Sequence, residues 1–99
     1  MSTAANIARQ VIHHEIESQI KIAAAKLETL KARAQAAKAN VEIKAIAMLL
    51  TRVPVILHQL QELQKSTGDH WERAKSDLET RIADFEKSVH GIEAKIKVH

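Results

Sequence analysis

The apolar pattern of this chain is densest in residues 41–63, which read VEIKAIAMLLTRVPVILHQLQEL. Fourteen of these 23 residues are apolar, and at helical spacing they form two stripes. One stripe contains Ala45, Leu49, Val53, Ile56, Leu60 and Leu63, and the other contains Ile43, Ile46, Leu50, Val53 and Leu57. A helix with two apolar stripes is covered from two sides. We therefore expect this segment to lie at the centre of a helical assembly.

Composition indicates one all-α domain spanning residues 1–99. The 99 residues are 45% hydrophobic, with two glycines, one proline and few aromatic side chains. The absence of cysteine excludes disulfides and thiolate metal sites. The longest apolar run, residues 45–57, is interrupted and shorter than the roughly 20 residues that a membrane span needs. Residues 1–10 hold no apolar run typical of a signal peptide. We expect no transmembrane segment and a cytoplasmic location.

A second apolar seam precedes the central segment. Its members alternate at spacings of four and three: Ile16, Ile20, Ala23, Leu27, Leu30, Ala34, Ala37 and Val41. This is a heptad pattern. Since no glycine or proline occurs between residues 4 and 53, the pattern predicts one long helix over about residues 4–65. Pro54 removes one hydrogen bond inside this helix and predicts a kink there, because the apolar spacing continues across it.

Residues 65–69 predict a turn, and a second helix is expected over about residues 69–98. Gly68 suits the left-handed position after a helix. The apolar face of the second helix contains Trp71, Ala74, Leu78, Ile82, Phe85, Val89, Ile92 and Ile96. A short turn predicts an antiparallel helical hairpin, in which Trp71 lies near Leu63 and is buried.

A hairpin alone leaves one stripe of the central segment in water, and exposed apolar stripes mark interaction surfaces. We therefore expect a homo-oligomer, a dimer or higher, that completes a four-helix core. The predicted interface contains Ile43, Ile46, Leu49, Leu50, Val53, Ile56, Leu57 and Leu60. In the alternative interpretation, the chain breaks near Asn40 and folds as a three-helix bundle, with helices at about 4–38, 41–65 and 69–98. A heterologous protein partner is compatible with either arrangement.

Charged residues flank both apolar seams. The basic flank contains Lys26, Lys31, Arg33 and Lys38, and the acidic flank contains Glu79, Glu86 and Glu93. Basic against acidic flank is the pairing expected when these helices assemble, with only tenths of a kcal/mol per exposed pair. The alternative function is a basic helical module that binds nucleic acid or an anionic membrane surface, because residues 21–52 hold seven Lys/Arg and two Glu. No nucleic-acid-binding motif accompanies these cations, so we expect no nucleic-acid partner.

Six histidines raise the question of a metal site. His13 and Glu17 share a helix face, as do Glu86 and His90, but two ligands per helix are too few for a stable site. The sequence contains no nucleophile–histidine–acid pattern and no glycine-rich phosphate loop. We expect no enzyme activity, cofactor or metal.

The last 40 residues resemble a family of small bacterial coiled-coil proteins associated with stress responses. The matching positions are Ser66, Gly68, Trp71, Glu72, Lys75, Leu78, Glu79, Phe85 and Val89. They follow that family's order of a short Ser/Gly turn, a Trp-Glu-x-x-Lys-x-x-Leu-Glu segment and an amphipathic helix. The resemblance implies a helical, non-catalytic protein with a stress-related role. The expected function is therefore self-association or protein–protein interaction.

Overall fold

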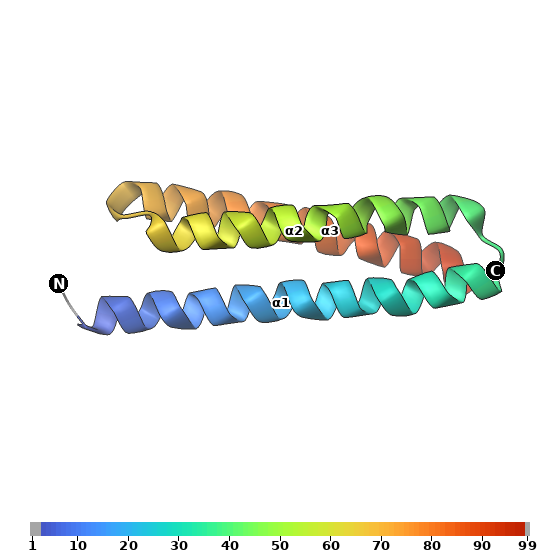
Figure 1. Ribbon diagram of the computed structural model, residues 1–99, viewed down its shortest axis with the longest axis horizontal. Helices are drawn as coiled ribbons and strands as arrows, with labels where there is room; N and C mark the ends of the chain where they lie inside the picture. Colours follow the sequence, from blue (N-terminus) through green and yellow to red (C-terminus); the bar gives the residue numbers. More distant parts are fainter. Residues whose placement is uncertain (1–2, 99) are drawn as a thin grey trace.

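The computed structural model describes residues 3–98, which form three helices and no strand. The helices are α1 (Thr3–Ala36), α2 (Asn40–Lys65) and α3 (Gly68–Val98). Helices α1 and α3 run in the same direction and α2 runs in the opposite one, so the start of α1 lies at the same end as the α2–α3 turn (Figure 1). The molecule is elongated, with extents of 55 × 18 × 18 Å.

All three pairs of helices are in contact, and their buried side chains form one core. The largest fully buried side chains come from α1 and α2: Ile20, Leu27, Leu30, Ile46 and Leu60. From Ile16 to Ala34 every predicted seam residue of α1 is buried, which confirms the heptad pattern in this part of the chain. The seam ends there, because Ala37 and Val41 are exposed.

The predicted single helix over residues 4–65 is wrong, because the chain leaves the helix after Ala36 and re-enters one at Asn40. The Ala39 N–H donates a hydrogen bond to the Ala34 carbonyl at 2.9 Å, and the Lys38 N–H donates to the Gln35 carbonyl at 3.2 Å. Lys38 adopts the left-handed conformation, with φ of 57°. This combination is the Schellman motif that ends helices, with lysine where glycine is usual. The break falls at the position that the alternative interpretation places near Asn40.

Burial explains why the chain turns at a residue without turn propensity. A left-handed non-glycine residue costs roughly 1–2 kcal/mol, whereas burying one leucine side chain stabilises by about 1.5–3 kcal/mol. Leu27 and Leu30 on α1 are 0% and 1% exposed. Folding α1 back therefore covers both its own seam and one side of α2, so the second stripe of α2 is covered within the same chain.

Helix α2 is continuous through Pro54, as the unbroken apolar spacing predicts. Pro54 lies on the exposed side of the helix. Proline has no N–H to donate to the Leu50 carbonyl, so one backbone hydrogen bond of α2 is absent.

The turn between α2 and α3 lies at residues 66–67, within the predicted range. Ser66 donates its N–H to the Leu63 carbonyl at 3.1 Å. Gly68 has φ of 59°, which confirms the left-handed position predicted for it. Trp71 is 8% exposed and shares a small hollow with Leu63, so its predicted burial is also confirmed.

Candidate interaction surface

A groove runs between α2 and α3 on the surface of the molecule. It consists of three adjoining hollows of about 170, 330 and 370 Å³, which share Arg81 and Arg52 as their boundaries. The hollow nearest the α2–α3 turn is lined by Gln59, Glu62, Leu63, Ala74, Asp77, Leu78 and Arg81. The middle hollow is lined by Arg52, Val55, Ile56, Arg81, Asp84 and Phe85. The third is lined by Ala45, Met48, Leu49, Arg52, Ser88, Gly91, Ile92 and Lys95.

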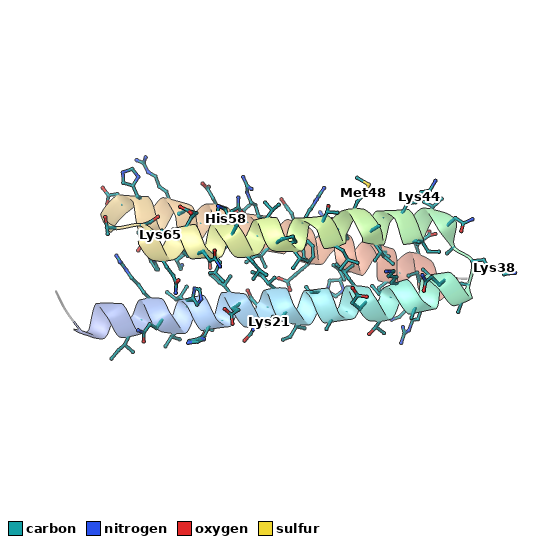
Figure 2. All side chains as sticks on the ribbon, in the orientation of Figure 1. Lys21, Lys38, Lys44, Met48, His58 and Lys65 are labelled. Carbon is teal, nitrogen blue, oxygen red and sulfur yellow. The ribbon has the colours of Figure 1, made fainter. Side chains whose placement is uncertain are left out.

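Three large apolar side chains of α2 are exposed along its outer side. Val41, Met48 and Val55 are 73%, 65% and 54% exposed. They are seven residues apart and therefore share one helix face. Figure 2 shows Met48 and Lys44 projecting from α2 away from α1. Met48 and Val55 also line the groove, so the groove has an apolar rim on its α2 side.

Gly91 forms the opposite wall beside Met48. A Cβ atom added to Gly91 would have no neighbour within 4 Å. Contacts within the chain therefore do not require glycine there, although glycine in a helix interior costs about 1 kcal/mol relative to alanine. The groove is open at this point and leaves the α3 backbone accessible.

Charge changes along the groove. Glu62 and Asp77 lie in the hollow nearest the turn, and Lys95 lies in the hollow at the far end. Arg52 and Asp84 line the middle hollow from opposite helices. Glu62 contacts His58 at 3.7 Å and Lys65 at 3.8 Å, both on its own helix.

The predicted interface residues lie mostly under this surface rather than on it. Ile46, Leu49, Ile56 and Leu60 are buried in the core of the same chain. Ile43, Leu50, Val53 and Leu57 are half-buried and pack against that core. Leu49 and Ile56 also form part of the groove wall. The residues that sequence reasoning missed are Met48, Val55 and Gly91, and the seven-residue spacing of Val41, Met48 and Val55 is the signal that could have found the first two.

The predicted charged flanks meet at one point. Lys26 on α1 and Glu93 on α3 form an ion pair at 3.1 Å. The hydrogen bond from Lys26 lowers the pKa of Glu93, and desolvation of the carboxylate opposes this shift. Glu86 lines a hollow of about 230 Å³ together with Lys26.

The other flank residues do not take part in that contact. Glu79 pairs with Lys75 of its own helix at 3.2 Å. Lys31 is half-buried, whereas Arg33 and Lys38 are exposed. The basic flank therefore continues beyond the acidic residues that could face it.

The cations of residues 21–52 do not share a face. Lys21 pairs with Glu17 at 3.0 Å and Lys26 pairs with Glu93, so two of the seven are engaged in ion pairs. Figure 2 shows Lys21 on α1, Lys38 at the α1–α2 connection and Lys44 on the far side of α2. A phosphate backbone laid along one side of the molecule would meet only some of them.

A separate hollow of about 270 Å³ lies at the end of the molecule near the α2–α3 turn. It is lined by Arg9, Gln10, His13, Leu63, Gln64 and Trp71. The Arg9 guanidinium lies 5.0 Å from the centre of the Trp71 ring, a cation–π contact that helps to cover the indole. His13 Nε2 contacts Glu17 at 3.5 Å, and His13 Nδ1 has no hydrogen-bond partner among the described residues. Its donors and acceptors suit water or a small polar molecule.

Within residues 3–98, no group of three or more His, Asp or Glu side chains is arranged to hold a metal ion. None of the helices in this range combines the length and apolarity of a membrane span. Comparison with known protein families, with curated proteins and with solved structures gave no match. The functional argument therefore rests on the groove and its surroundings.

Proposed function

We propose that this chain is a non-enzymatic helical protein that acts by binding another polypeptide along the α2/α3 groove. The partner is another copy of the chain or a different protein with an amphipathic helix. The observation that carries this proposal is the exposure of Met48 and Val55 at 65% and 54% beside an open groove. Covering large apolar side chains is the main source of association energy between proteins.

The composition of the groove supports a protein partner over a small molecule. The three hollows are shallow and continuous along two helices, which is the shape that accepts a helix laid into a groove. Small-molecule sites are instead concave and enclose most of the ligand surface. Residues 43–61 contain no acidic side chain, so the α2 side of the groove favours a partner with acidic residues along its edge.

The physiological setting follows from the resemblance of the last 40 residues to stress-associated coiled-coil proteins. Under that interpretation, the interaction is expected to respond to stress conditions. The scaffold itself needs no cofactor for this role, since the binding surface is made of helix side chains alone.

Site-specific photo-crosslinking tests the proposal. A benzophenone side chain at position 48 should form discrete protein adducts, in the purified protein or in cell extract, which mass spectrometry can identify. The matched control carries the same group at Ala25, which is exposed on α1. Val55→Glu should remove the adducts formed at position 48. Equal adduct patterns at positions 48 and 25, or no adducts at position 48 in either preparation, would contradict the proposed function.

A further inference from the structure

We propose that the occupant of the α2/α3 groove is a second copy of this chain, docked antiparallel about a twofold axis. The axis passes the groove at a level between Arg52 and Val55, close to Pro54. This inference rests on the proposed function, because it names the partner of the same surface.

The charge sequence along the groove is self-complementary when it is reversed. Reversal about this level places Glu62 and Asp77, at the turn end, opposite the partner's Lys95 at the far end. It also places Arg52 opposite the partner's Asp84, and Asp84 opposite the partner's Arg52. A parallel arrangement would instead set each of these charges against itself. Opposite charges across an interface fix its register, and like charges exclude the wrong one.

The charges in the middle of the groove are available for such pairing. Among the ion pairs of residues 3–98, none involves Arg52, Asp77, Asp84 or Lys95. Arg52 and Asp84 line the same hollow in one chain. In the dimer, each of them would gain a partner from the other copy.

Size and shape also fit a second copy. A side of the molecule measures up to 55 by 18 Å, which accommodates a standard interface of about 800 Å² per partner. Met48 and Val55 supply the apolar centre of this face, and the open space at Gly91 lets the other copy approach the α3 backbone. Because the twofold operation relates the two copies, each copy covers the exposed apolar side chains of the other.

The resulting assembly contains a layer of four helices, α2 and α3 from each copy, with α1 on the outside. It differs from a four-helix core built on one long helix, because each copy keeps its own closed fold. The central stripes of α2 remain covered by α1 and α3 of the same chain.

Paired charge reversal tests the register. Arg52→Glu alone and Asp84→Arg alone each place two like-charged pairs in the dimer, and each should weaken self-association at least about tenfold in sedimentation equilibrium. An equimolar mixture of the two variants should restore a dimer to within about threefold of the wild-type Kd. In the mixed dimer, the glutamate introduced at position 52 faces the arginine introduced at position 84, and the second pair keeps its unaltered arginine and aspartate. Lys21→Glu, on α1, is the control and should leave the Kd unchanged.

Distance measurements test the direction of packing. Spin labels at position 55 of the two copies should be offset by only about 5 Å along the axis, whereas labels at position 45 should be offset by about 26 Å. Far-UV circular dichroism should show that all variants retain their helices, since the substituted positions are exposed or lie on the groove wall.

Three outcomes would overturn the inference: a wild-type monomer at all concentrations, failure of the mixture to restore association, or equally short distances for both label positions. These outcomes are distinguishable from failure of the proposed function. If the purified chain is monomeric but position 48 crosslinks to a different protein in extract, the second-copy inference is wrong and the proposed function stands.

Discussion

Lys38→Gly tests the connection between α1 and α2 more directly than any other substitution. Lys38 has φ of 57° and is exposed, so its side chain makes no core contact that the change would remove. Glycine adopts this conformation without the steric cost of about 1–2 kcal/mol that other residues meet. Part of this gain is lost, because glycine also increases the conformational entropy of the unfolded chain by about 0.4–1 kcal/mol. The net expectation is a stabilisation of about 0.5–1 kcal/mol.

The sign of this change separates the two folds that the sequence allows. In a continuous helix over residues 4–65, position 38 would be a helix interior, where glycine destabilises by up to about 1 kcal/mol. Urea unfolding followed by circular dichroism at 222 nm measures the difference. Ala32→Gly is the matched control, because Ala32 is exposed in the interior of α1 and should lose up to about 1 kcal/mol in either fold. A lower urea midpoint for Lys38→Gly than for wild type, with an unchanged slope, would refute the reasoning.

Three further substitutions test the core, the proline and the interhelical ion pair. Trp71→Ala should destabilise by about 3 kcal/mol in urea unfolding, because the indole is 8% exposed; a loss below about 1 kcal/mol would show that the ring is not part of the core. Pro54→Ala should raise the thermal midpoint and stabilise by up to about 3 kcal/mol, since α2 runs through this position; a lower midpoint would argue against a continuous helix. Glu93 has a folded-state pKa below its ordinary value of 4.5, so the stability from its pairing with Lys26 is complete above that value and is lost as the pH falls through the lower folded pKa. Glu93→Gln should therefore be less stable than wild type at neutral pH, with the difference shrinking in acid and at high salt; a difference independent of pH would contradict an ionic contribution.

The helices themselves follow from local and periodic features of the sequence. Ile16 to Ala34 lie at heptad spacing and are buried, and Gly68 marks the turn into α3 because only a residue without Cβ takes its conformation at no cost. Trp71 is the first apolar residue after that turn and is buried near Leu63. In these places the residue type and the structure agree, so the pattern is sufficient.

The connection at residues 37–39 could not be predicted in the same way. The residues there have helix propensity, and the left-handed position is filled by Lys38 rather than by glycine. The turn exists because α1 gains more from packing against the other two helices than it loses at one strained residue. That gain depends on contacts distant in sequence, which propensity does not report.

The candidate surface could be predicted only in part for a related reason. Two apolar stripes on residues 41–63 show that the helix has two neighbours, but they do not show whether those neighbours belong to the same chain. Once α1 folds back, the stripes are covered, and the exposed apolar residues become Met48 and Val55. Their exposure depends on where α1 and α3 lie, so it follows from the tertiary arrangement and not from the residues alone.

The closed connection also determines how folding and association are related. A dimer built on a straight helix through Lys38 would have to detach α1, expose Leu27 and Leu30, and cover them again with the second copy. In that case a substitution at Lys38 would change stability and dimer affinity together, as in domain swapping. Docking of two closed chains along the α2/α3 groove leaves α1 in place, so the two equilibria are separate. Lys38→Gly should then stabilise each chain without changing the dimer Kd, whereas Arg52→Glu should weaken the dimer without changing the stability of the chain.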